Sequence, residues 1–170
     1  MLRLLGALLL AGGAGALGFS AAARLSRRTA VLRALLGALD GMERELAFRL
    51  APMPEMLDRV AQESPSPVGE LFACCREKLD ELGEKSMPEL WREALEQVPL
   101  GLEGPARLTV EGLGDVLGRY DGEGQRTALA HARAELELAL EQAREDGEKR
   151  GRMYRVLGVA AGAFLVILLL

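Results

Sequence analysis

The residue types that most often carry out chemistry are scarce in this sequence. It contains one histidine, His131, and two cysteines, the adjacent Cys74 and Cys75. A metal site or a general base built on His131 needs partner residues, and no second histidine supplies one. Vicinal cysteines rarely bond to each other, and on a helix their side chains point about 100° apart. We therefore expect all three to be ordinary helix residues, and no metal centre is predicted.

Other stretches resemble catalytic motifs only in part. The glycines of GLGDVLG (residues 112–118) are spaced somewhat like a dinucleotide fingerprint, but no strand precedes them. No phosphate-binding loop with Lys followed by Ser or Thr is present, and no serine lies in a nucleophile elbow. Carboxylate pairs such as Glu43 and Glu45 are typical of solvated helix faces. The sequence therefore predicts a protein that is not an enzyme and that uses no cofactor and no small-molecule substrate.

The composition predicts an all-α fold. Apolar residues make up 49% of the 170 residues but aromatic residues only 4%. Leu and Ala supply most of the apolar surface and are good helix formers, whereas the residues that favour strands are few. The 21 basic and 25 acidic residues are interleaved and leave a net charge of −4. This balance lacks the basic footprint of a nucleic-acid-binding domain.

Both ends of the chain carry uncharged apolar runs that predict membrane anchors. Residues 4–23 have the length of about 20 residues that crosses a bilayer. The competing interpretation is a cleaved signal peptide, because Ala21-Ala22-Ala23 offers a small-residue cleavage site. Residues 156–170 are shorter than the ~30 Å hydrocarbon core, but Met153 and Tyr154 extend them. We therefore predict transmembrane helices over residues 1–24 and 153–170, with a helical domain over residues 25–152.

Basic residues beside the two anchors predict how they are oriented. One cluster follows the first anchor and another precedes the second: Arg24, Arg27 and Arg28, then Lys149, Arg150, Arg152 and Arg155. Basic flanks remain on the cytoplasmic side of a membrane. Both anchors therefore predict a cytoplasmic middle domain with the two termini outside. A cleaved signal peptide would instead export the middle domain, and the second basic cluster argues against export.

Apolar periodicity and breaks predict a bundle of six helices between the anchors. The expected ranges are about 26–50, 54–63, 68–82, 86–98, 105–118 and 121 onward, the last either continuing into the second anchor or kinking near Gly147 and Gly151. Ser86 and Glu89 form a capping-box signature. Inward-facing positions are expected to include Leu46, Leu82, Trp91 and Leu95. Gly114 and Gly118 share one helix face, where close backbone approach is expected.

A corner is predicted where the fifth helix ends and the sixth begins. Gly118 ends one helix, and the Asp121 carboxylate can accept the backbone donors that open the next. Two interpretations remain open. Gly118, Arg119, Asp121 and Gln125 either build this corner only, or present Arg119 and Gln125 to a partner.

Several segments together resemble the stage III sporulation protein AB family of endospore-forming bacteria. They are the start MLRLLGALLL, the proline-containing stretch 46–57, WREAL (91–95), LGDVLGRYDGEGQ (113–125) and the end MYRVLGVAAGAFLVILLL. The resemblance covers essentially the whole chain, including both anchors. It implies a subunit of the channel complex that joins mother cell and forespore, located in the mother-cell membrane around the forespore.

The resemblance also implies partners. The family's cytoplasmic domain is similar to the helical F domain of platform proteins in type II secretion and type IV pili, which couple a cytoplasmic ATPase to membrane parts. By analogy, this chain would bind the stage III sporulation AA ATPase and neighbouring membrane subunits, and it would be compatible with a homo-oligomer. A static tether that holds two membrane helices in an assembly without contacting an ATPase remains the alternative.

Overall fold

The computed structural model of the chain describes residues 25–47, 52–118 and 122–169, without the side chains of residues 122, 150–152 and 154–169. Six α-helices and no strand occur in these ranges, which confirms the all-α prediction. The first helix covers residues 25–47, and it is followed by α2 (Met53–Glu63), α3 (Val68–Lys78), α4 (Met87–Gln97), α5 (Pro105–Leu117) and α6 (Gly122–Leu169). The predicted residues 48–50 of the first helix lie outside the described ranges.

The chain divides into two compact units. Residues 30–141 form one unit, which we call the helical domain, and residues 1–29 with 142–170 form the other. Helix α6 contributes to both and is continuous through Gly147 and Gly151. Over the part of the chain that the structure describes, no helix is long and apolar enough to cross a membrane. The predicted anchor over residues 1–24 lies outside the described residues, as do the side chains of residues 154–170.

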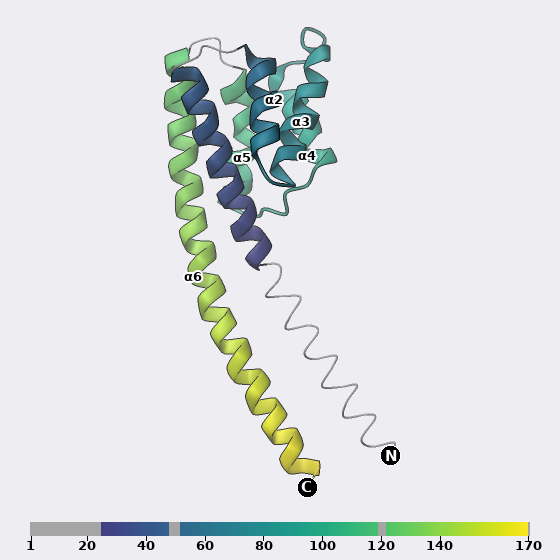
Figure 1. Ribbon diagram of the computed structural model, residues 1–170, viewed down its shortest axis with the longest axis vertical. Coiled ribbons are helices and arrows are strands. Elements are labelled where there is room, and N and C mark those ends of the chain that lie inside the picture. The colour runs from purple at the N-terminus through teal and green to yellow at the C-terminus, as the bar shows by residue number, and fades with distance from the viewer. Residues whose placement is uncertain (1–24, 48–51, 119–121, 170) are drawn as a thin grey trace. The chain divides into compact units, whose positions relative to one another are not determined.

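The helices α2 to α5 of the helical domain follow one another in space as in sequence. Helix α2 packs on α3, α3 on α4, and α4 on α5, with the direction of the chain reversing at each connection (Figure 1). The connection over residues 79–86 therefore lies at the opposite end of these helices from the connections over residues 64–67 and 98–104. Prolines stand in the first turns of α2, α4 and α5, where a helix does not need the missing N–H.

The core of the helical domain centres on one aromatic pair. The rings of Phe72 and Trp91 are fully buried, with centroids 5.4 Å apart. The indole Nε1 of Trp91 donates a hydrogen bond to the Val110 carbonyl at 2.8 Å, which satisfies the polar atom of this side chain. Leucines from the first helix and α6 are buried as well, among them Leu32, Leu35, Leu39, Leu129 and Leu136.

Gly114 allows α4 and α5 to approach closely. A Cβ at this position would lie 2.9 Å from the Cα of Pro88, closer than real Cβ atoms come, and 3.0 Å from the Cβ of Trp91, which is tighter than most. At Gly118, one turn later, a Cβ would lie 3.2 Å from the Cβ of Met87. The expectation of close approach on this face of α5 is confirmed.

The observed start of α4 agrees with the sequence prediction, whereas the observed end of α3 differs from it. The capping box before α4 is confirmed, because the Glu89 carboxylate accepts the Ser86 N–H at 2.8 Å. The third helix does not reach Leu82, however. It ends at Lys78 and continues as a short 3₁₀ turn, Leu79–Glu81. A 3₁₀ turn advances about 120° per residue instead of 100°, and Leu82 then becomes extended.

The altered turn places Leu82 outside, with 57% of its surface exposed, so the prediction that it faces inward is wrong. Leu46 and Leu95, which were also expected to face inward, are half-buried.

Candidate interaction surfaces

The reactive side chains of the helical domain lie in unreactive settings. Burial raises the pKa of the Cys75 thiol to about 12, and it also raises the pKa of Cys74, whose Sγ donates to the Gln97 carboxamide at 3.1 Å. Both thiols are therefore protonated at neutral pH and are weak nucleophiles. His131 is exposed, with Nδ1 3.6 Å from a Glu135 carboxylate oxygen. Among the described residues, no group of His, Cys, Asp and Glu could hold a metal ion.

An ion-pair network joins the first helix to α6. One oxygen of Asp40 accepts from the Arg133 guanidinium at 2.7 Å, and the other accepts from Arg44 at 2.9 Å. Arg133 also lies 3.1 Å from Glu137 and 3.6 Å from Glu43. Helical periodicity carries no information on such a network, because its central pair is 93 positions apart in the chain.

The first helix is also joined to α2 by a largely buried carboxylate. Glu45 is 9% exposed, and its Oε1 accepts a hydrogen bond from Arg59 at 2.9 Å. The sequence had suggested that Glu45 lies on a solvated helix face, and the structure shows instead that it is largely buried. A carboxylate at this depth is tolerated because it is paired.

A second ion-pair network fixes the connection between α3 and α4. The Lys85 ammonium lies 2.8 Å from Glu81 and 2.7 Å from Glu93, and Lys78 lies 3.2 Å from Glu93. Hydrogen bonds to Glu81 and then to Glu93 raise the pKa of Lys85, while Lys85 and then Lys78 lower the pKa of Glu93. The charges of these four side chains are thus engaged within the domain.

The predicted corner between the fifth and sixth helices is only partly described. Gly118 ends α5 beside Met87, while Arg119 and Asp121 lie outside the described residues. Gln125 is 4% exposed, and its amide nitrogen has no hydrogen-bond partner in the described structure. The Gln125 side chain is therefore covered in this structure. Whether the corner only packs or also contacts a partner through Arg119 and Gln125 stays a prediction.

The basic residues predicted to set the orientation are described in part. Arg27 is exposed, Arg28 is half-buried, and Lys149 is exposed with its ammonium 3.1 Å from Glu145. Arg24 and the side chains of Arg150, Arg152 and Arg155 lie outside the description. The orientation that these residues imply stays a prediction.

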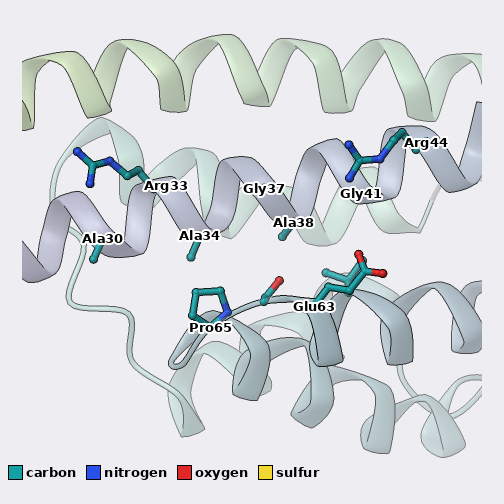
Figure 2. Close-up of a pocket in the computed structure, with 11 residues that line it drawn as sticks. Ala30, Arg33, Ala34, Gly37, Ala38, Gly41, Arg44, Glu63 and Pro65 are labelled. Atoms are coloured by element: carbon teal, nitrogen blue, oxygen red, sulfur yellow. The ribbon is translucent and has the colours of Figure 1, made fainter.

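Several open grooves lie on the described surface of the helical domain, and two of them border α2 or α4. The first, of about 470 Å³, runs along small residues of the first helix, including Ala34, Gly37 and Ala38, and faces the end of α2. Figure 2 shows Ala34 and Ala38 on the side of the helix that faces Pro65, with Arg33 beside Ala34 and Arg44 beyond Gly41. The second groove, of about 670 Å³, lies between α4 and α5 and has a mixed rim that includes Arg92, Glu96, Arg107 and Glu111. Among the described residues, neither groove is lined by a cysteine or a histidine.

Comparisons with known proteins point to one family, and the two sequence comparisons cover nearly the whole chain. The family model for stage III sporulation protein AB matches residues 3–170. Stage III sporulation protein AB of Bacillus subtilis (strain 168) is 28% identical over 172 residues, covering 100% of both chains. A solved structure of a stage III sporulation protein AB superposes with a TM-score of 0.63 at 24% identity. It covers 71% of this chain and 96% of the other, which supports the fold.

Proposed function

The chain belongs to the stage III sporulation protein AB family, and on this basis we propose that it is a platform subunit of the channel complex between mother cell and forespore. In this role it links a cytoplasmic ATPase of the secretion type, the stage III sporulation AA ATPase, to the membrane components of the channel. It performs no catalysis of its own. The family match over residues 3–170 is the observation that carries the proposal.

The surface chemistry of the helical domain supports a role in binding proteins. Its charges are arranged in networks that hold the helices together, and its grooves are open and lined by small, apolar and charged side chains. Burial raises the pKa of the Cys75 thiol, and His131 is exposed with a single carboxylate, Glu135, nearby. Such a surface is better suited to binding other proteins than to catalysing a reaction.

We place the helical domain on the cytoplasmic side of the mother-cell membrane around the forespore. In this arrangement the segments over residues 1–24 and 153–170 cross the membrane, and the two chain termini lie outside. The basic residues next to both segments support it, among them Arg27 and Lys149.

Thiol labelling in intact cells tests this orientation. With Cys74 and Cys75 replaced by Ala, a Ser66→Cys chain carries one thiol, on the exposed connection between α2 and α3. A membrane-impermeant maleimide should label it only after the cells are permeabilised. Labelling before permeabilisation would instead support the exported domain of the signal-peptide interpretation.

Binding to the ATPase tests the coupling role. The full-length chain, purified in detergent with an affinity tag, should retain the purified stage III sporulation AA ATPase. The ATPase should not be retained when the affinity tag alone, without the chain, is immobilised. A chain that is folded by circular dichroism but does not bind the ATPase would favour the static tether.

A further inference from the structure

Positive and negative charges are separated along the chain. All 25 acidic residues lie within residues 40–148, together with 12 of the 21 basic residues. The segments before and after this range hold the other nine basic residues and no acidic residue. The middle of the chain therefore has a net charge of −13, whereas the two flanking segments together have a net charge of +9.

The fold brings most of the flanking basic residues into one unit. Residues 1–29 and 142–170 form this unit, which includes the start of the first helix and the later part of α6. Helix α6 continues without a break from the acidic stretch that ends at Glu148 into the basic stretch that begins at Lys149 (Figure 1). The basic region, as we call it, consists of the residues of this unit that flank the predicted anchors: Arg24, Arg27, Arg28, Lys149, Arg150, Arg152 and Arg155.

The described side chains of the basic region lack the internal ion pairs of the helical domain. Arg27 and Arg28 form no ion pair with any described residue, and the buried Nε of Arg28 has no hydrogen-bond acceptor there. Lys149 lies 3.1 Å from Glu145, but this pair is exposed and contributes little. By contrast, seven of the ten described basic residues within residues 40–148 form ion pairs: Arg44, Arg59, Arg76, Lys78, Lys85, Arg107 and Arg133.

The residue types of the basic region indicate which anion it would bind. Six of its seven residues are arginine, whose planar guanidinium binds phosphate oxygens through two parallel hydrogen bonds. A bilayer with anionic phospholipids presents phosphate groups at its surface and attracts basic residues that lie beside a membrane segment. The same surface repels the acidic middle of the chain. Charge alone therefore favours contact with an anionic bilayer through the basic region.

We propose that the basic region is a binding site for the phosphate groups of anionic phospholipids. This inference rests on the proposed location of the chain in a membrane and adds a preference for one class of lipid. It goes beyond orientation, because basic residues that only set the direction of insertion require no preference for anionic lipid in the assembled protein.

Binding of fluorescently labelled lipids to the full-length chain in a neutral detergent tests the inference. Fluorescence anisotropy should show that phosphatidylglycerol binds about tenfold more tightly than phosphatidylcholine, which carries a phosphate but no net charge. The difference should shrink in high salt. Inorganic phosphate at the same concentration as the lipid should not displace it. Equal binding of the two lipids would overturn the inference, and displacement by inorganic phosphate would show that the region binds free phosphate instead of lipid.

Paired substitutions test whether the basic region is responsible. Arg27→Gln with Arg28→Gln should weaken phosphatidylglycerol binding about tenfold and leave phosphatidylcholine binding unchanged. Arg150→Gln with Arg152→Gln should do the same, so that the test remains if one pair disturbs folding, which circular dichroism monitors. The matched control, Arg92→Gln with Arg126→Gln, removes two exposed arginines of the acidic middle and should bind like the parent. An equal loss in the control would overturn the inference.

The thiol-labelling experiment separates the inference from the location on which it rests. If Ser66→Cys is labelled before permeabilisation, the proposed location is wrong and the inference is wrong with it. If labelling requires permeabilisation and the chain shows no preference for phosphatidylglycerol, the inference alone is wrong.

Discussion

The helical domain contains two helix pairs that are joined in different ways. Helices α4 and α5 are neighbours in the sequence and meet through close backbone approach at Gly114 and one buried hydrogen bond from Trp91. The first helix and α6 come from opposite ends of the domain, and charged side chains around Asp40 and Arg133 link them. The first kind of contact depends on close packing, so that one added methyl group changes the stability of the domain. The second adds ion pairs to buried leucines, and the contribution of these ion pairs is screened by solvent and salt.

Removal of the Trp91 side chain should have the largest effect on stability. Trp91→Ala should lower the free energy of unfolding by about 3–5 kcal/mol, since it leaves a cavity against Phe72 and removes the donor to Val110. Trp91→Phe keeps most of the volume and should cost less. Urea denaturation followed by circular dichroism measures both. Equal losses for the two variants would assign the stability to the hydrogen bond instead of the packing.

Two glycines of α5 should respond in opposite directions to the same change. Gly114→Ala should destabilise the domain by about 1–3 kcal/mol, because the new methyl group meets the backbone of Pro88 at 2.9 Å. Gly112→Ala should stabilise it by up to about 1 kcal/mol, since nothing lies within 4 Å and alanine favours the helix. Thermal melts of the two variants provide the comparison. A Gly114→Ala domain as stable as the parent would show that α4 and α5 can separate without cost.

The ion pair between the first helix and α6 should matter less. Asp40 and Arg133 are both 39% exposed, and pairs of this kind contribute about 0.2–1 kcal/mol. A double-mutant cycle with Asp40→Asn and Arg133→Gln should give a coupling energy in this range, and it should shrink in high salt. A coupling energy above about 2 kcal/mol that is insensitive to salt would mean that the pair is effectively buried.

The capping box of α4 should produce the smallest effect, and only in acid. Hydrogen bonds from the backbone N–H and the hydroxyl of Ser86 lower the pKa of Glu89 from its usual 4.5. A carboxyl whose pKa is lower in the folded state stabilises the fold above its unfolded pKa, and this stability is lost as the pH falls through the folded value. Glu89→Gln should therefore melt below the parent at pH 7, and the difference should shrink as the pH falls below the usual carboxyl pKa of 4.5. A difference that persists in acid would have another cause.

Local chemistry was sufficient to predict much of this protein. Proline and glycine breaks placed the boundaries of α2 and α5 near their observed positions, and Ser86 with Glu89 marked the start of α4. The spacing of Gly114 and Gly118 indicated a face for close approach, and the full-length resemblance identified the family. The helix boundaries, the capping box and the glycine spacing depend on residues within one or two turns of each other. They can therefore be predicted without knowledge of the fold.

Packing between distant segments decided the rest. Periodicity placed Leu82 inside, but a 3₁₀ turn after Lys78 directs it outward. Glu45 resembles a surface carboxylate in sequence, yet Arg59 of α2 covers it, and Gln125 resembles a surface amide but is buried. Asp40 finds its partner in Arg133, far along the chain. Helical spacing states which residues share a face, whereas the burial or pairing of that face depends on which other helix lies against it.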